Sequence, residues 1–289
     1  ARSPLATHPR AACTMIDPHT HSTASDGTLA PAAVVRRAHA NGVDLLALTD
    51  HDELLGLPEA TATAAELGLR FVPGVEVSVS WLDQTLHIVG LGFDPSNGAL
   101  IEGLGKVRGG RDGRAVLIAA ELDRIGIRGS LEGALSYAGN PALVSRAHFA
   151  RYLVEIGISK NVHDVFLHYL ARGKPGFVEH VWATLEDALG WIKGAGGLAV
   201  IAHPGRYRLS HAEMDILFDK FRDLGGDAVE VSCGAHDGGQ VLAFARLARK
   251  FGLMASRASD FHGPEDSPID LGRAPPLPQD LTPVWSQLI

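Results

Sequence analysis

The sequence predicts an α/β fold of barrel type with an inserted helical region, and three observations support this prediction. The chain has 289 residues, 46% hydrophobic and 20% charged, which suits a soluble protein with a core large enough for one α/β barrel. Strand-like and helix-like segments alternate along most of it. Histidines and carboxylates follow the strand-like segments, and barrels of parallel strands carry their active sites at the carboxyl ends of those strands.

The first part of the predicted barrel covers residues 15–99. Pro31 is typical of a first helical turn, and Asn41-Gly42 and Gly68 are typical helix ends. The predicted elements are a strand ending near residue 17, helices over 31–40 and 57–67, and strands over 45–48, 70–79 and 86–93. The alternation of strand and helix up to residue 79 indicates a parallel sheet, and the strand over 86–93 follows the turn Leu82-Asp83-Gln84.

The rhythm changes over residues 100–180, where helical patterns are separated by glycines and prolines and no strand is predicted. The predicted helices there are 116–125, 131–137, 146–156 and 162–170. We expect this region to be a helical insertion over the barrel that serves as a substrate lid.

The barrel is predicted to resume over residues 181–274, where Ser210-x-x-Glu213 has the capping-box spacing of a helix start. The predicted elements are helices over 185–195 and 240–251, a helix from Ser210, and strands over 198–202, 228–232 and 253–256. Residues 275–289 are proline-rich and are predicted to form an extended C-terminal tail.

The N-terminal residues and the cysteines indicate the cellular compartment. Residues 1–14 lack the apolar segment of a secretory signal, so we expect a disordered extension or an expression remnant, with Met15 as the natural start. No apolar run approaches the roughly 18 residues that span a bilayer. Cys13 and Cys233 make no disulfide framework, which favours a reducing cytoplasm.

The charge distribution favours a small anionic substrate. The formal net charge of −7 argues against a protein that coats nucleic acid by bulk electrostatics. Between Lys106 and Arg151, however, eight Lys and Arg face four Asp and Glu, an excess of four positive charges. Such a segment indicates either a site for an anion or a solvated, arginine-rich helix face.

Nine side chains are candidate metal ligands. His19 and His21, two residues apart after an apolar run, would project from one face of a strand end, and Asp26 lies in a Ser-Asp-Gly turn. The nine are His19, His21, Asp26, His51, Glu76, His87, His203, Asp260 and His262. Imidazole with carboxylate suits Zn, Mn or Fe(II), and nine ligands suffice for two or three ions, bridged by Asp26 or Glu76. The other histidines, such as His39 and His236, are interpreted as ordinary core or surface residues.

The combined motifs resemble those of the PHP family, named for polymerase and histidinol phosphatase domains. The motifs are Asp17-x-His19-x-His21-Ser22, Ser25-Asp26-Gly27, Thr49-Asp50-His51-Asp52, Gly74-Val75-Glu76, His203-Pro204 and Ser259-Asp260-x-His262. The resemblance implies a distorted (β/α)7 TIM-like barrel that carries two or three divalent ions, with Mn expected and Zn or Fe as alternatives, and hydrolyses phosphoesters. Pro18 and Arg257-Ala258 depart from the commoner pattern without removing a ligand.

Within that family, three segments look most like the TrpH/YciV-like branch: residues 144–151, 172–175 and 203–207. The resemblance implies a 3′,5′-nucleoside bisphosphate phosphatase, or a 5′→3′ exoribonuclease acting on short RNA. Two metals about 3.5–4 Å apart would activate water and clamp phosphate oxygens, so we expect direct attack by metal-bound hydroxide without a covalent intermediate.

Several residues are candidates for substrate contacts and proton transfer. Arg146 would bind phosphate in a bidentate manner and Lys174 as a point charge, with His148 and Arg206 as further contacts. A helix-surface ion pair and a solvated turn are the ordinary alternatives for Arg146 and Lys174. His203 or Asp50 would assist the leaving group.

The expected reaction removes the 3′-phosphate of a nucleoside bisphosphate such as pAp, with AMP and phosphate as products, or degrades short 5′-phosphorylated RNA. No membrane and no obligate protein partner are expected. The alternatives are a histidinol-phosphate phosphatase and an inert PHP domain that binds nucleic acid or a partner, although no ligand is missing. An amidohydrolase should carry a carbamylatable lysine at a strand end, and the motif strands have none.

Overall fold

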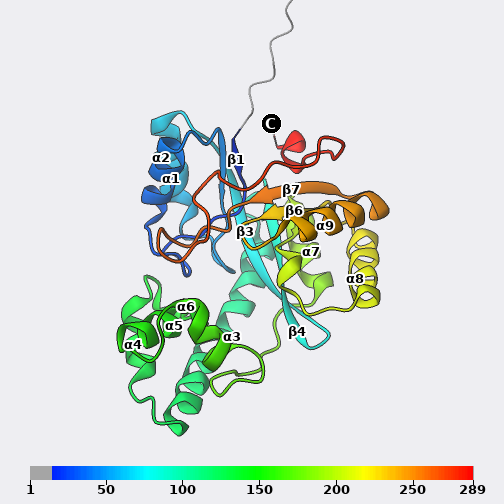
Figure 1. Cartoon of the computed structure of the whole chain (residues 1–289). Coiled ribbons are helices and arrows are strands. Elements are labelled where there is room, and N and C mark those ends of the chain that lie inside the picture. Colours follow the sequence, from blue (N-terminus) through cyan, green and yellow to red (C-terminus); the bar gives the residue numbers. More distant parts are fainter. Residues whose placement is uncertain (1–14, 289) are drawn as a thin grey trace, which may run out of the picture.

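The computed structural model describes residues 15–288 and shows a seven-stranded barrel with a helical insert at one end (Figure 1). The predicted extension over residues 1–14 lies outside the described part. The strands are β1 (Ile16–Asp17), β2 (Leu45–Leu48), β3 (Arg70–Trp81), β4 (Gln84–Leu91), β5 (Leu198–Ile201), β6 (Ala228–Cys233) and β7 (Met254–Ala258). The helices are α1 (Pro31–Ala40), α2 (Leu57–Leu67), α3 (Gly98–Arg124), α4 (Ser130–Tyr137), α5 (Arg146–Glu155), α6 (Val162–Val165), α7 (Leu185–Gly194), α8 (His211–Asp223) and α9 (Gly238–Phe251).

The strands follow one another around the sheet in sequence order. The predicted parallel arrangement holds from β1 to β3 and from β5 to β7, but β4 runs antiparallel to both of its neighbours. The strand–helix alternation that predicted a parallel sheet therefore does not extend to β4. The reason is the two-residue turn at Leu82-Asp83, because a parallel neighbour needs a crossover of a dozen or more residues.

Contacts between the first and last strands nearly close the barrel. Just beyond β1 and β7, the His21 amide donates to the Phe261 carbonyl (2.8 Å), and the Asp260 amide donates to the His19 carbonyl (3.1 Å). The buried Asp17 carboxylate accepts from the amides of Ser259 (2.9 Å) and Gly272 (2.7 Å). These contacts confirm a seven-stranded PHP-type barrel and bring the first and last ligand motifs together.

Strand alternation decides which side chains face the barrel interior. On β3, Val75 and Val77 pack in the layer between barrel and helices, whereas Val72 belongs to the interior cluster. Glu76 is an even number of residues from Val72, so it also faces inward. On β4, Val89 lies in the interior cluster, and His87 shares its face. The residue pattern thus places the side chains of Glu76 and His87 on the same, inward face of the sheet.

Helix α3 is much longer than predicted. It begins at Gly98, where the Asn97 side chain accepts from the Leu100 amide, and not near residue 116. Its glycines were interpreted as separators, but two of them permit close packing: a Cβ on Gly103 would lie 2.3 Å from the Trp191 ring, and one on Gly110 would lie 2.4 Å from the His180 ring. The first part of α3 thus belongs to the barrel layer and the rest to the insert.

The insert has its own hydrophobic core. Leu122 of α3, Phe149 and Leu153 of α5, and Val165 of α6 pack in one buried cluster, separate from those of the barrel. The predicted helices over 131–137, 146–156 and 162–170 correspond to α4, α5 and α6, the last continued by a π-helical turn over Phe166–Leu170. This packing places α5 under the open end of the barrel (Figure 1).

The C-terminal segment packs against the barrel. The Ala255 amide of β7 donates to the Thr282 carbonyl (2.8 Å), and Val284 is fully buried in the interior cluster. The segment thus covers the barrel end opposite the ligand motifs. Among residues 15–288, no helix is both long enough and apolar enough to cross a membrane.

Candidate metal centre

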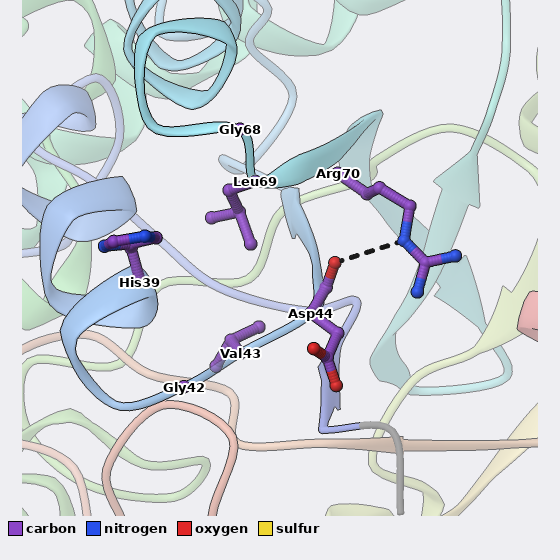
Figure 2. A pocket seen from close by; sticks show the side chains of 7 residues that line it. All are labelled: His39, Gly42, Val43, Asp44, Gly68, Leu69 and Arg70. Atoms are coloured by element: carbon purple, nitrogen blue, oxygen red, sulfur yellow. Dashed lines mark hydrogen bonds between the residues drawn. The ribbon is translucent and has the colours of Figure 1, made fainter. Parts of the chain in front are cut away.

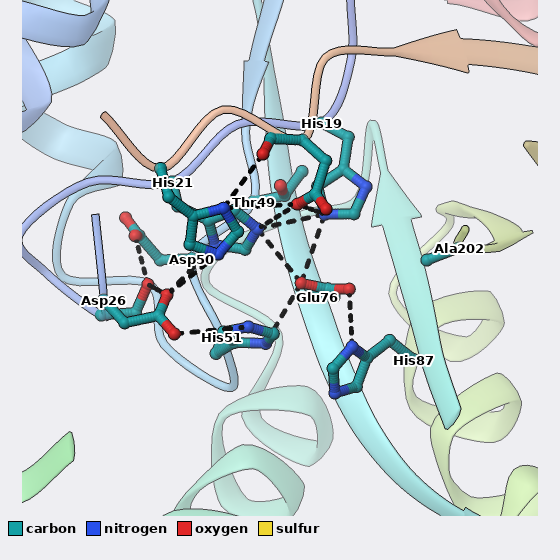
Figure 3. A network of polar contacts seen from close by, with 12 residues as sticks. His19, His21, Asp26, Thr49, Asp50, His51, Glu76, His87 and Ala202 are labelled. Carbon is teal, nitrogen blue, oxygen red and sulfur yellow. Dashed lines mark hydrogen bonds and ion pairs between the residues drawn. The ribbon is translucent and has the colours of Figure 1, made fainter. Parts of the chain in front are cut away.

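All nine predicted ligands converge at the carboxyl end of the barrel. Figure 3 labels six of them: His19, His21, Asp26, His51, Glu76 and His87. They form four overlapping groups in which the potential ligand atoms lie within 4.8 Å of one another. The groups are His21, Asp26, His51 and His262; His19, Glu76 and His203; His19, His21 and Asp260; and His51, Glu76 and His87. This overlap is the arrangement that a centre of several ions requires, because some ligands are shared.

Glu76 lies at the middle of these groups. The imidazoles with a nitrogen 2.9–3.2 Å from its carboxylate belong to His19, His21, His51, His87 and His203. The Oε2 atom contacts three of these rings and Oε1 contacts the other two. A carboxylate shared in this way can bridge two cations, one at each oxygen.

Several buried polar atoms of the centre have no aligned hydrogen bond among the described residues. They are His21 Nδ1, His51 Nδ1, His203 Nδ1, Glu76 Oε2 and both carboxylate oxygens of Asp260. Buried polar groups without partners cost free energy, and a coordinated cation would satisfy these atoms. The donor set of imidazole nitrogens and carboxylate oxygens therefore fits divalent metal ions.

Neighbouring charges shift the pKa values of the buried ligands in the direction opposite to burial. Burial alone would lower the pKa of His19 and His21, but the nearby carboxylates raise the pKa of His21 to about 10 and that of His19 well above its usual value. Burial alone would raise the pKa of Glu76 and Asp260, but neighbouring charges lower both values well below normal. Histidines have this effect on Glu76, and Arg206 together with histidines has it on Asp260. The carboxylates are thus held ionised, as metal ligands must be.

A tenth residue, the acidic Glu230, supports the centre from β6 and was not predicted from the sequence. Glu230 is buried, its Oε1 lies 2.7 Å from His19 Nδ1, and its Oε2 accepts from the His203 amide (2.6 Å). An imidazole that gives its Nδ1 proton to a carboxylate presents Nε2 to a metal. A glutamate inside the apolar run 228–233 was the available signal.

Two ligands sit on left-handed backbone. His203 has φ of 26° and Asp260 has φ of 55°, values that are uncommon for residues other than glycine. Ala199 and Ile201 of β5 pack toward the helices, so strict alternation would send His203 outward as well. The left-handed turn instead directs its imidazole to Glu76, and such strain is typical of functional sites.

Asp50 occupies a different position from the ligands. Its carboxylate accepts from the Ser22 amide (2.8 Å) and hydroxyl (2.7 Å) and from the Ser25 hydroxyl (2.6 Å). It belongs to none of the four potential metal groups found among residues 15–288. These bonds fix the turn that presents Asp26.

The predicted substrate contacts differ in their surroundings. Arg206 pairs with Asp260 Oδ2 at 2.6 Å, and the buried His148 accepts from the Ser145 amide (3.0 Å) at the start of α5. Arg146 is half-buried, and Lys174 is exposed in a turn. The Ser145 hydroxyl donates to Asp26 Oδ2 (3.2 Å), so the start of α5 touches the metal cluster directly.

A separate pocket lies away from this chemistry. It is lined by His39, Gly42, Val43, Asp44, Gly68, Leu69 and Arg70 (Figure 2). These residues surround the starts of β2 and β3, whereas the ligands follow the strand ends. The pocket contains none of the nine ligands, so we assign it no part in the reaction.

Comparisons with known proteins agree with this geometry. A model of the family described as PHP domain matches residues 17–224. The chain is 50% identical over 273 residues to the 3′,5′-nucleoside bisphosphate phosphatase of Chromobacterium violaceum, a match that covers 94% of this chain and 96% of that protein. It is 44% identical over 271 residues to the 5′-3′ exoribonuclease Rnm of Escherichia coli, covering 93% and 92%.

Two solved structures are similar over nearly the whole chain. One is described as an amidohydrolase from Chromobacterium violaceum with bound sulfate and no metal; its TM-score is 0.92 at 49% identity, and the match covers 95% of this chain and 96% of that one. The other, from Bifidobacterium adolescentis, is classed as a metal-dependent phosphoesterase, with a TM-score of 0.79 at 26% identity and coverage of 96% and 95%.

Proposed function

This chain belongs to the PHP domain family, and from that premise we propose that it removes the 3′-phosphate of 3′,5′-nucleoside bisphosphates such as pAp. It is a hydrolase of phosphoester bonds, as its named relatives are. The observation that carries the proposal is the convergence of all nine ligands around Glu76, in a chain half identical to a bisphosphate phosphatase over 273 residues.

The proposed cofactors are two or three divalent ions, with Mn the first choice and Zn or Fe the alternatives. When bound, such ions supply a water that is reactive at neutral pH and neutralise the phosphoryl oxygens. Glu76 and Asp26 are the proposed bridging ligands, because each contacts several imidazoles from different strands.

The protein's own residues hold and protonate the substrate in this proposal. Asp50 already accepts three hydrogen bonds from Ser22 and Ser25, so we assign it the positioning of the Asp26 turn. His203 remains the proposed proton donor to the leaving oxygen, since its Nδ1 has no aligned partner among the described residues. Arg146, His148, Lys174 and Arg206 remain the proposed substrate contacts.

A second candidate is the stepwise 5′→3′ hydrolysis of short 5′-phosphorylated RNA, which the 44% identity to the Escherichia coli exoribonuclease favours. Nothing comparable favours histidinol phosphate. An inert binding domain should have lost ligands, and an amidohydrolase of the carbamate type should carry a lysine at a strand end. All nine ligands are present, and no lysine of the chain lies in a described strand. We also infer a cytoplasmic enzyme that needs no obligate protein partner.

The test is phosphate release by the Mn-loaded protein from pAp, a 5′-phosphorylated RNA pentamer and histidinol phosphate. Turnover of pAp or RNA that falls at least about 1,000-fold in Asp260→Ala or His19→Ala supports the proposal. Asp280→Ala, an exposed carboxylate paired with Arg249, is the matched control and should retain full activity. Turnover of histidinol phosphate alone would overturn the substrate assignment, and no turnover at full metal occupancy would favour the inert domain.

A further inference from the structure

A cluster of arginines lies where the insert meets the metal centre. Arg111 and Arg114 project from α3, and Arg146 begins α5. Arg111 is buried and paired with a carboxylate: its Nη2 binds the Asp52 carboxylate and donates to the Ser78 hydroxyl (3.0 Å), while its Nε has no hydrogen bond among the described residues. This pair shows how the charge of a buried guanidinium is normally balanced in a protein.

Arg114 and Arg146 are not satisfied in this way. Among the side chains that the structure describes, no carboxylate lies within 4.0 Å of either guanidinium, and each donates to a backbone carbonyl, Val178 at 3.2 Å and Leu170 at 3.3 Å. Arg114 is only 8% exposed, and Arg146 is half-buried. Each side chain thus keeps a full positive charge away from bulk water with only neutral acceptors.

Aromatic rings hold these guanidiniums in place. Arg114 lies 5.3 Å from the centre of the Trp182 ring, and Arg111 lies 4.8 Å from the same ring centre. Arg146 lies 5.6 Å from the Phe166 ring centre. Such stacking orients the planar group but does not neutralise it.

The surroundings disfavour the charged form of both groups. Burial, followed by the charges of Arg146 and Arg111, lowers the pKa of Arg114 to about 9. Burial and the charge of Arg111 lower the pKa of Arg146 to about 10. Like charges gathered in a poorly solvated place indicate that an anion belongs between them.

We propose that Arg114 and Arg146 form an anion subsite for the phosphate group that the enzyme does not hydrolyse. The inference rests on the proposed function and deepens it, because it makes the second phosphate of the substrate the feature that is recognised. Two guanidinium forks can bind one phosphate group through several charge-assisted hydrogen bonds.

Two short links span the interval between the subsite and the metal centre. Ser145, which precedes Arg146, donates to Asp26 Oδ2 (3.2 Å). Arg111, which lies on the same helix as Arg114, donates to Ser78, two residues along β3 from Glu76. A substrate that spans this interval presents one phosphate to the metal centre and the other to the arginines. A nucleotide with a single phosphate can satisfy only one of the two.

The first test uses Arg114→Met in the full-length, Mn-loaded protein. The measurement is the ratio of kcat/KM for adenosine 3′,5′-bisphosphate to that for adenosine 3′-monophosphate. We expect this ratio to be well above one in the wild type and to fall about 10- to 100-fold in the variant. Arg124→Met is the matched control, because Arg124 lies on the same helix, is 72% exposed and pairs with Glu121, and its ratio should equal that of the wild type.

A second readout is independent of turnover. Inorganic phosphate should raise the unfolding temperature of the metal-free wild type and of Arg124→Met, but not that of Arg114→Met. A wild-type ratio near one, or equal phosphate stabilisation of wild type and Arg114→Met, would overturn the subsite. If neither nucleotide is hydrolysed, the proposed function fails, while the phosphate experiment on the metal-free protein still decides whether the anion subsite exists.

Discussion

The carboxyl end of the barrel and the adjoining edge of the insert leave opposite charges unsatisfied. Around Glu76, buried carboxylate oxygens and imidazole nitrogens lack aligned partners, which a cation would supply. Around Arg114, buried guanidinium groups have no paired carboxylate among the side chains that the structure describes, and an anion would supply the opposite charge. A phosphoester joins the two regions, because its phosphoryl oxygens bind cations at one end and a second phosphate binds arginines at the other.

The two regions also differ in how they hold their side chains. The metal ligands follow strand ends, and hydrogen bonds from Asp50 and Glu230 fix their turns and rings. The arginines lie on helices of the insert and are held by Trp182 and Phe166. This difference matches the proposed division of roles, in which the barrel holds the metal ligands and the insert selects the substrate. The following predictions test this division, beginning with the largest effect.

Substitution of Arg111 and of Arg114 should have different effects on stability, because Arg111 has a structural role and Arg114 a proposed binding role. Arg111→Met would leave the fully buried Asp52 carboxylate without its cation, so we expect the free energy of unfolding to fall by about 3–5 kcal/mol. Arg114→Met removes an unpaired buried charge, and we expect a change of less than about 1 kcal/mol. Urea unfolding of both variants in phosphate-free buffer measures the difference. Equal losses would mean that both arginines are structural.

The variant Glu230→Gln tests whether Glu230 positions the metal ligands His19 and His203. In Glu230→Gln the amide can no longer accept from both His19 Nδ1 and the His203 amide, so the ring that should present Nε2 to a metal is no longer fixed. We expect Mn affinity to fall about 10- to 100-fold, measured by competition with a chelator. Glu186→Gln, an exposed residue paired with Lys220, is the control. Unchanged affinity in Glu230→Gln would show that the contact with His19 is incidental.

Much of the metal centre could be predicted because its residues follow strand ends in short motifs. His19 and His21 share one face of a strand end, so their role as ligands can be inferred without knowing any distant contact. Glu230 was missed because its role depends on a ring 211 residues away. Arg114 was visible only as one of several positive charges, since the sequence does not reveal that no described carboxylate approaches it.

The barrel and most insert helices were likewise predicted from their local patterns, and the errors have local causes. The reversal of β4 follows from the two-residue turn at Leu82-Asp83, which alternation alone does not reveal. The start of α3 was missed because glycine normally weakens helices, whereas Gly103 is needed there for contact with Trp191. In both cases a tertiary contact or connection outweighed intrinsic preference.

The last prediction concerns His148, a buried residue of the insert whose charged neighbours include Asp26. Burial, with Arg151 and Arg111 adding to it against the attraction of Asp26, lowers its pKa to about 4. In the unfolded chain the ring takes up a proton near 6.5, so between pH 6.5 and 4 the unfolded state binds more protons. The stability contributed by the neutral ring is therefore lost as the pH falls through this window.

His148→Gln should remove this pH dependence while keeping an acceptor for the Ser145 amide. When the pH falls from 6.5 to 5, the free energy of unfolding should fall by about 2 kcal/mol less in the variant than in the wild type. Urea unfolding at constant metal occupancy measures this difference. His168→Gln, an exposed histidine of the same insert, should behave like the wild type. Parallel losses in wild type and His148→Gln would mean that His148 is protonated in the folded protein, and the insert would then present a further positive charge to the substrate.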